Sequence, residues 1–272
     1  MAAALPELRT VALARGASNG AALRIELHRP ERMNAWDKQL GLDLLAAVEL
    51  AAEDPAVRAV TLTGSGRAFS SGADLRAGFD PRPSDGRPDV GTALRERYHP
   101  IITGVRRMPK PVLAAVNGPA VGIGCSLALA CDLVLAAESA YLLLAFVNIG
   151  LVPDGGSSVF VPARAGAGRA AAMAMLGERV PAAQALAWGL VDRVATDDAF
   201  AAEAEALTER LATGPTRAYA AAKAQLNARV YAGLGEQLEL EASLQEEMAG
   251  SADFVEGVAA FLEKRAPGFS GQ

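Results

Sequence analysis

The run KPVLAAVNGPAVGIGCSLALACD, residues 110–132, contains three successive patterns. Val112–Val116 is a short apolar run typical of a buried strand, residues 118–124 are rich in glycine and predict a turn, and residues 125–131 have the small side chains of a packed helix. Residues 111–131 carry no charge and could span a bilayer by length alone, but their prolines, asparagine and glycines favour strand, turn and helix. We therefore expect an α/β fold and no membrane-spanning segment.

The residues around this run alternate between strand and helix patterns. Apolar and polar residues alternate over 23–27, as in a half-exposed strand, and further strands are expected over 57–63 and 133–136. Between the first two strands, Asn34 is expected to open a helix, with Asp37 three residues later as in a capping box. The alternation continues to about residue 196 and predicts an α/β class.

Two segments differ from this pattern. Residues 78–91 (GFDPRPSDGRPDVG) are rich in proline, glycine and charge, and predict a mobile surface loop. Residues 197–272 are almost uninterrupted helix by composition. We expect them to pack on the core or on a neighbouring subunit, and we place the domain boundary between residues 196 and 197.

Composition excludes several classes of function. The formal net charge is −5 and the isoelectric point is about 5.2, which disfavours a nucleic-acid partner. Cys125 and Cys131 fit neither a redox pair nor a zinc knuckle and are interpreted as buried reduced thiols. With His28 and His99 as the only histidines, neither a metal site nor a histidine-centred triad is expected. The first 16 residues lack the pattern of a signal peptide, so a soluble cytoplasmic protein is predicted.

Three turns of small residues could hold a ligand: residues 70–75, 117–125 and 149–156. In the second turn, glycines let backbone N–H groups approach a ligand at the start of a helix, which suits an anion or a developing oxyanion. The turn is neither a Walker loop nor a complete GxGxxG fingerprint. From spacing alone, three ordinary tight turns are an equally good interpretation.

Four segments together resemble the crotonase (enoyl-CoA hydratase/isomerase) superfamily. They are residues 110–132, 68–75 (AFSSGADL), 32–35 (RMNA) and 188–191 (WGLV), and their order and spacing agree along nearly the whole chain. The resemblance implies a spiral of ββα units over residues 1–196 that binds acyl-CoA. It also implies that the helical region 197–272 mediates trimerisation, with trimers commonly pairing into hexamers.

The resemblance further implies an acyl-coenzyme A thioester as the ligand. Coenzyme A would be part of the substrate, so no separate cofactor is expected. The thioester oxygen would accept hydrogen bonds from the backbone amides of Ala73 and Ile123. Most family members have glycine where Ile123 stands, and the larger side chain is expected to narrow the acyl pocket while leaving the N–H in place.

The acidic residues distinguish reactions within the family. Ser126 and Phe146 occupy the positions of the two glutamates that hydratases use, so the two-carboxylate apparatus for water addition is absent. Asp154 aligns with the catalytic aspartate of several isomerases. An apolar surround would raise its pKa and suit it to general-base catalysis. The alternative role is a helix N-cap, which the following Gly-Gly-Ser-Ser would also fit.

Other positions are expected from the resemblance to contact the substrate. Arg32 and Arg76 are candidate partners for coenzyme A phosphates, and Lys264 could reach the coenzyme of a neighbouring subunit, although simple solvation explains all three equally well. Asp74 and Asp132 are expected to fix turns. The full set expected to bind substrate is Arg32, Ser71, Gly72, Ala73, Asp74, Leu75, Arg76, Gly122, Ile123, Gly124, Phe146 and Lys264.

Residues 236–242 and 256–269 resemble the phenylacetate-pathway isomerases, which act on a ring-epoxidised phenylacetyl-CoA and on unsaturated acyl-CoAs. We therefore expect an acyl-CoA isomerase that shifts a double bond or rearranges a ring epoxide, with Asp154 as the general base. The alternatives are an enoyl-CoA hydratase with a non-standard site and a non-catalytic acyl-CoA-binding protein.

Overall fold

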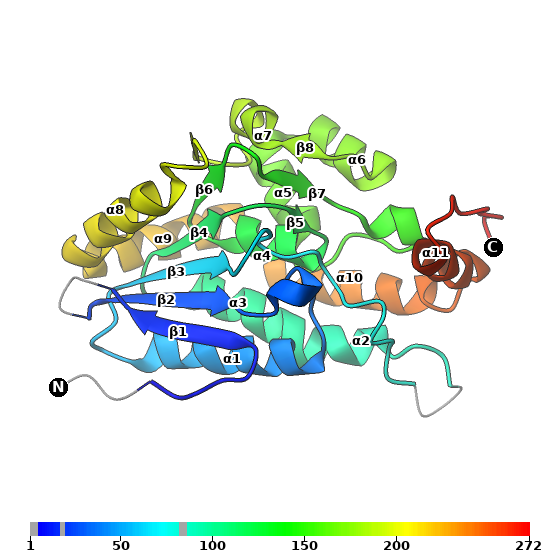
Figure 1. Cartoon of the computed structure of the whole chain (residues 1–272), viewed down its shortest axis with the longest axis horizontal. Coiled ribbons are helices and arrows are strands. Elements are labelled where there is room, and N and C mark those ends of the chain that lie inside the picture. The colour runs from blue at the N-terminus through cyan, green and yellow to red at the C-terminus, as the bar shows by residue number, and fades with distance from the viewer. Residues whose placement is uncertain (1–4, 17–19, 82–85) are drawn as a thin grey trace.

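The computed structural model describes residues 5–16, 20–81 and 86–272, whose strands form two sheets (Figure 1). The main sheet has six strands in the order β1 (Val11–Arg15), β2 (Ala22–Leu27), β3 (Ala59–Gly64), β4 (Val112–Val116), β6 (Leu133–Ala137) and β9 (Arg193–Ala195). Only the β1–β2 pair in this sheet is antiparallel. The smaller sheet has the order β5 (Ala120–Val121), β7 (Tyr141–Leu143) and β8 (Val180–Pro181).

Helices follow or separate most of the strands. They are α1 (Lys38–Glu53), α2 (Val90–Ala93), α3 (His99–Arg107), α4 (Ile123–Ala130), α5 (Ser157–Ala165), α6 (Ala167–Leu176), α7 (Ala182–Trp188), α8 (Phe200–Thr213), α9 (Thr216–Val230), α10 (Leu234–Met248) and α11 (Ala252–Glu263). Shorter segments are the 3₁₀ helices η1 (Pro30–Arg32) and η3 (Phe146–Ile149) and the π-helical η2 (Leu94–Tyr98), which joins α2 to α3.

The α/β class predicted from the sequence is confirmed. Strand β4 coincides with the predicted strand at Val112–Val116, and β2, β3 and β6 lie within two residues of their predicted bounds. All five residues of β4 are buried, as expected for a central parallel strand covered on both faces.

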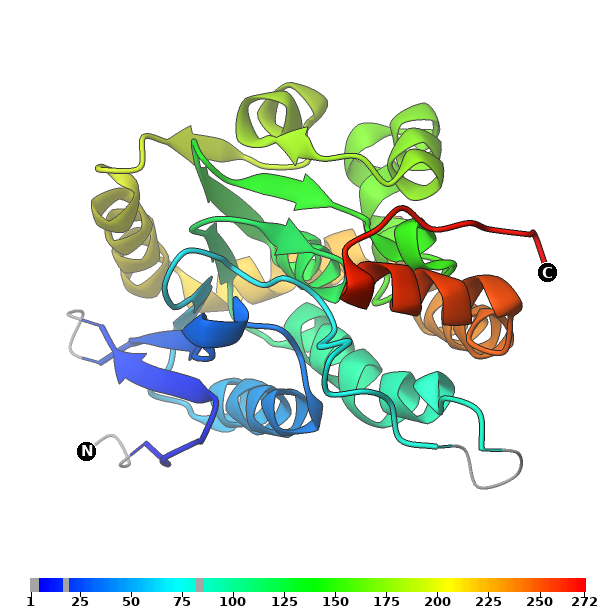
Figure 2. The same cartoon turned by 45° about the vertical axis from the view of Figure 1, so that its right-hand side comes forward.

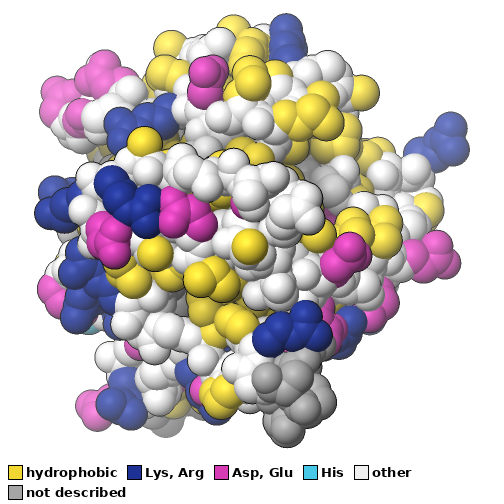
Figure 3. Space-filling view, turned by 90° about the vertical axis from the view of Figure 1, so that its right-hand side faces the viewer, with side chains coloured by type: hydrophobic (Ala, Val, Ile, Leu, Met, Phe, Trp, Pro, Cys, Tyr) yellow, Lys and Arg dark blue, Asp and Glu magenta, His cyan; other side chains and the backbone are white. Residues whose placement is uncertain are grey.

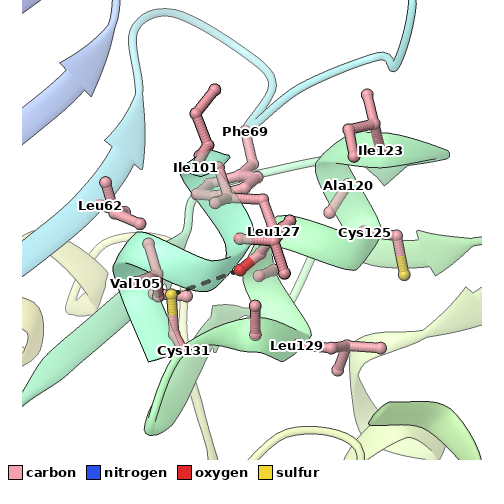
Figure 4. Packing of buried hydrophobic residues seen from close by; sticks show 14 of the residues in the cluster. Leu62, Phe69, Ile101, Val105, Ala120, Ile123, Cys125, Leu127, Leu129 and Cys131 are labelled. Atoms are coloured by element: carbon pink, nitrogen blue, oxygen red, sulfur yellow. Dashed lines mark hydrogen bonds between the residues drawn. The ribbon is translucent and has the colours of Figure 1, made fainter. Parts of the chain in front are cut away.

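The main sheet is covered by helices on both faces (Figure 1). On one face, α1, α3 and α4 bury a large apolar cluster against the strands. Figure 4 shows part of it, where Leu127 of α4 lies among Phe69, Ile101 and Val105. On the other face, Leu207 and Leu211 of α8 form a second apolar cluster with alanine and leucine side chains of the sheet.

Both cysteines are buried free thiols, as predicted. Cys125 lies in α4, and Cys131 is the residue directly after this helix (Figure 4). The Cys131 thiol donates to the Leu127 carbonyl oxygen at 3.4 Å. Burial raises the pKa of each thiol to about 12, which keeps both in the unreactive protonated form.

The predicted helix start at Asn34 is wrong. Helix α1 begins at Lys38, and its N-cap is Asp37, whose carboxylate accepts from the Leu40 N–H at 2.8 Å. Asn34 instead adopts a left-handed conformation with φ of 54°, which asparagine tolerates better than most residues.

The Asn34 side chain holds two distant segments together. Its Oδ1 accepts from the Arg29 N–H, and its Nδ2 donates to the carbonyl oxygens of Ser65 and Ala68 at 2.9 and 2.8 Å. The Asn34 carbonyl oxygen also accepts from the Ser70 hydroxyl at 2.9 Å. These long-range bonds explain why local capping rules fail at this residue.

The predicted loop over 78–91 is shorter than expected, because α2 begins at Val90. Residues 82–85 lie outside the described part of the chain, so the predicted mobility stays a prediction. On either side of them, Pro81 pairs with Pro88 in an isolated antiparallel bridge, and Phe79 packs edge-on against Phe254 with ring centroids 5.6 Å apart.

The C-terminal helices fold back on the core of their own chain. Helices α8 and α9 lie at one end of the molecule, while α10 and α11 lie at the other end near α2 (Figures 1 and 2). In residues 5–16, 20–81 and 86–272, no helix combines the length and apolar character needed to span a membrane.

Replacing Asn34 with alanine should destabilise the fold markedly. Asn34→Ala removes the amide that donates to the Ser65 and Ala68 carbonyl oxygens, leaves Ala68 with the longer 3.3 Å bond from Asn117, and places an alanine at positive φ. We expect the free energy of unfolding, measured in urea, to fall by about 2–4 kcal/mol. The matched variant Asn148→Ala loses one exposed bond to Gly177, and should cost less than about 1 kcal/mol. Equal losses in the two variants would contradict this interpretation.

Candidate functional site

A cavity of about 1070 Å³ lies between two glycine turns, those of residues 70–75 and 117–125, and the helices α2, η2, α10 and α11. Figure 3 looks onto the end of the molecule that carries these helices, where hydrophobic side chains gather between charged ones. The cavity wall includes Ala73, Ile123 and Asp154, so the three residues predicted to act on a substrate share one space.

Two glycines with positive φ bring the first two turns together. Gly72 has φ of 90° and Gly122 has φ of 53°. A Cβ atom added to Gly72 would lie 3.1 Å from the Val121 carbonyl oxygen and 3.8 Å from the Gly122 Cα. A side chain at Gly72 would therefore push the turns apart.

The amides that follow these glycines are free. Around Ala73, the Trp36 N–H donates to the Gly72 oxygen at 2.7 Å and the Asp74 N–H donates to the Trp36 oxygen at 2.9 Å. The N–H of Ala73 itself and that of Ile123, the first residue of α4, donate to no atom of the described residues. Two fixed, unpaired donors that line one cavity can stabilise a negatively charged oxygen.

Asp154 is buried at the same cavity with one half of its carboxylate unpaired. Oδ2 accepts from Gln245 Nε2 at 3.1 Å, whereas Oδ1 has no partner among the described residues. The main chain is held firmly, because the Asp154 carbonyl oxygen accepts from the hydroxyls of Ser126 and Ser157 at 2.7 and 2.8 Å. One carboxylate oxygen of Asp154 is therefore buried without a hydrogen-bond partner in the described part of the chain.

Burial raises the pKa of the Asp154 carboxyl well above its usual range, and the nearby carboxylate of Glu241 adds to the increase. Phe146, Ile149 and Leu151 line the same cavity and supply the apolar surround that was predicted. Ile123 lies beside Gly155, the residue after Asp154, since a Cβ atom added to Gly155 would be only 2.4 Å from the Ile123 Cδ1 atom.

The alternative role of Asp154 as a helix cap is not supported. Helix α5 begins at Ser157. Its N-cap residue is Gly156, which has no side chain that could cap the helix. The capping carboxylate is that of Glu241 in α10, which accepts from the N–H groups of Gly156 at 2.8 Å and Ser158 at 3.2 Å and also from the Ser158 hydroxyl.

Most residues predicted to contact substrate line the cavity, and some do not. The lining includes Ser71, Gly72, Ala73, Asp74, Leu75, Gly122, Ile123 and Phe146. Gly124 lies behind it, packed against Ser70. Arg32, Arg76 and Lys264 are exposed and outside the lining, although each is next to a lining residue in the chain.

Asp74 and Asp132 are fixed in the framework, as predicted. Asp74 pairs with Arg29 at 3.1 Å. Asp132 pairs with Arg106 at 3.1 Å and with the buried Lys223 at 2.8 Å. In the described ranges, no group of three or more His, Cys, Asp or Glu side chains is arranged to hold a metal ion.

Gln245 and Tyr98 also belong to the site and are missed by the sequence analysis. Tyr98 lines the cavity, and burial together with the charge of Asp154 raises the pKa of its phenol. Gln245 is fully buried on the face of α10 that also carries Glu241, one helical turn earlier. Two polar residues on an otherwise apolar helical face are the signal that could have identified this contribution.

The raised pKa of Asp154 predicts a pH-dependent stability difference. The folded state holds the Asp154 proton more tightly than the unfolded state, so ionisation costs stability as pH rises above about 4. Asp154→Asn should therefore be more stable than wild type at pH 8, by about 1.4 kcal/mol for each unit of pKa difference, and the gap should shrink toward pH 4.

Thermal unfolding at several pH values measures this difference. Asp198→Asn is a suitable control, because hydrogen bonding lowers the pKa of that exposed carboxyl and the pH dependence should have the opposite sign. A wild-type protein more stable than Asp154→Asn at pH 8 would contradict the prediction.

Comparisons with known proteins agree with this geometry. A family model described as Enoyl-CoA hydratase/isomerase matches residues 17–272. A probable enoyl-CoA hydratase of Rhodobacter capsulatus is 45% identical over 248 residues, covering 91% of this chain and 94% of that protein. The 1,2-epoxyphenylacetyl-CoA isomerase of Escherichia coli K12 is 38% identical over 250 residues, covering 92% and 95%.

Solved structures extend the agreement to three dimensions. The crystal structure of an enoyl-CoA hydratase from Mycobacterium avium subsp. paratuberculosis K-10 superposes with a TM-score of 0.87 at 38% identity, covering 97% of this chain and all of the other. These matches confirm the superfamily and the fold class expected from the sequence.

Proposed function

Because the chain belongs to the enoyl-CoA hydratase/isomerase family, we propose that it is an acyl-CoA isomerase that shifts a double bond, or rearranges a ring epoxide, through an enolate. One observation carries this proposal. The unpaired Oδ1 of Asp154 belongs to a buried carboxylate on the same cavity as the free amides of Ala73 and Ile123.

In the proposed double-bond shift, the thioester oxygen accepts hydrogen bonds from the Ala73 and Ile123 amides. The developing enolate charge is stabilised there, and each such donor contributes roughly 3–4 kcal/mol in the transition state. Asp154 removes a proton from one carbon of the acyl group and returns it to another. The electron pair of the broken C–H bond forms the relocated double bond, and the electron pair of the original double bond forms the new C–H bond with the returned proton, so one base completes the reaction without water.

The environments of Ser126 and Phe146 favour isomerisation over hydration. The Ser126 hydroxyl is engaged with the carbonyl oxygens of Asp154 at 2.7 Å and Gly122 at 3.3 Å. The Phe146 ring faces Gly122, with its nearest carbon 3.8 Å from an added Cβ there. Neither position offers a second carboxylate to activate water. The competing functions are an enoyl-CoA hydratase with a non-standard site and a non-catalytic acyl-CoA-binding protein.

Coenzyme A binding is proposed along the exposed side of the first turn. Arg32 and Arg76 would pair with its phosphates, since a guanidinium binds phosphate in a bidentate manner. Lys264 would serve the coenzyme of a neighbouring subunit. A homotrimer or a dimer of trimers is proposed on the C-terminal helices, where Leu240, Leu244 and Val255 expose apolar side chains.

The role of Asp154 is tested by Asp154→Asn with an unsaturated acyl-CoA as substrate. We expect kcat for double-bond migration to fall by about 10²–10⁴, because the base is lost, while KM changes little. The control variant Asp198→Asn changes an exposed carboxylate after β9 and should keep wild-type kinetics. Migration at the wild-type rate in a folded Asp154→Asn protein would disprove the assignment.

A product assay in deuterium oxide separates the three functions. A short enoyl-CoA should undergo double-bond migration faster than water addition, and solvent deuterium should enter the acyl chain through Asp154. Water addition without migration would identify a hydratase. A bound acyl-CoA that shows no migration, no water addition and no deuterium uptake would identify a non-catalytic binder.

A further inference from the structure

The side-chain amide of Gln245 forms hydrogen bonds through its nitrogen and none through its oxygen among the described residues. Its Nε2 donates to the Asp154 Oδ2 atom at 3.1 Å and to the Val152 carbonyl oxygen at 2.5 Å. Both partners are acceptors, which fixes the orientation of the amide group. Its Oε1 is buried without a hydrogen-bond partner in the described part of the chain.

Helix α10 holds this amide rigidly. Gln245 is completely buried, and Glu241 on the same face is bonded to the start of α5. Arg95 of η2 binds Glu239 of α10 at 2.7 Å, which ties the helix to the wall that carries Tyr98. A side chain fixed in this way restricts the carboxylate that it contacts.

Because Nε2 holds Oδ2, the carboxylate plane of Asp154 is set and Oδ1 is the oxygen left over. We infer that Gln245 is a positioning residue, which orients the Asp154 carboxylate and presents Oδ1 to the acyl group. This inference rests on the proposed function, since it assigns how the base of that reaction is aligned. The residue acts through Asp154 and is not itself a proton carrier.

The same bond affects how readily Asp154 ionises. A donated N–H stabilises the charged carboxylate, and so opposes the effects of burial and of Glu241. The titratable groups that face Asp154 are Glu241 from α10 and Tyr98 from η2, and Tyr98 in turn is influenced by Arg97 and Asp37. Loss of the Gln245 amide should therefore make Asp154 harder to ionise.

Gln245→Met tests this inference, because methionine keeps the length of the side chain and removes its donors. The pH profile of kcat for double-bond migration should move upward by about one pH unit on its acidic limb. At a pH on that limb, kcat should fall about tenfold, with KM within about twofold of wild type. Gln184→Met, on the exposed face of α7, makes the same chemical change away from the cavity and should leave the profile in place.

A double-mutant cycle shows whether Gln245 acts through the base. Adding Gln245→Met to Asp154→Asn should change the residual rate by less than about twofold, because there is no longer a carboxylate to orient. Independent, multiplicative losses would overturn the inference, as would a Gln245→Met enzyme with an unshifted pH profile.

Two further outcomes keep the proposals separate. Wild-type migration by Asp154→Asn would reject the proposed function itself. An inactive Asp154→Asn together with a Gln245→Met enzyme that behaves like Gln184→Met would reject only the positioning role.

If Gln245→Met does not fold, Gln245→Glu replaces it. The added carboxyl is the third buried one beside Asp154 and Glu241 and should shift the acidic limb upward by more than about one unit, and an unshifted limb would again overturn the inference.

Discussion

The hydrogen bonds that Glu241 accepts at the start of α5 determine what Asp154 can do. Glu241 and Asp154 are both buried, and the charge of Glu241 acts on Asp154. Glu241 of α10 accepts from the N–H groups of Gly156 and Ser158, whereas the Asp154 carboxylate has a single bond, to Gln245, and one oxygen without a partner among the described residues. A buried polar atom without a partner costs stability, and proteins retain such atoms mainly where they serve a function.

The two donors proposed to hold the thioester oxygen are backbone groups rather than side chains. Gly72 and Gly122 allow two turns to approach closely, and the amides of Ala73 and Ile123 are the donors that result. Such donors are fixed before any ligand arrives, and their effect is strongest where water is excluded. One carboxylate and two amides require no histidine or reactive cysteine, which agrees with a sequence that has two histidines and two buried thiols.

Local sequence patterns are sufficient to predict the strands and turns, but they do not predict hydrogen bonds between residues far apart in the chain. The apolar run at Val112–Val116 and the glycines around Ile123 are recognisable because their neighbours in sequence create the signal. Asn34 was misassigned because its partners, Ser65 and Ala68, lie more than thirty residues away. Gln245 was missed for the same reason, since its partner Asp154 is 91 residues earlier. The burial of Asp154 could be anticipated from its apolar neighbours in the sequence. That Glu241 of α10, and not Asp154, caps the start of α5 could not be anticipated, because Glu241 is distant in the sequence.

The position of Glu241 and Gln245 near the end of the chain has a consequence for biosynthesis. A ribosome produces both sheets and both glycine turns before it reaches α10. Until then, the start of α5 has no carboxylate to bind, and Asp154 has no amide to orient it. The nascent chain is therefore chemically incomplete although its core strands are present. The candidate site is complete only once α10 has been synthesised and has packed on the core, so the order of synthesis separates the strands of the core from the completed site.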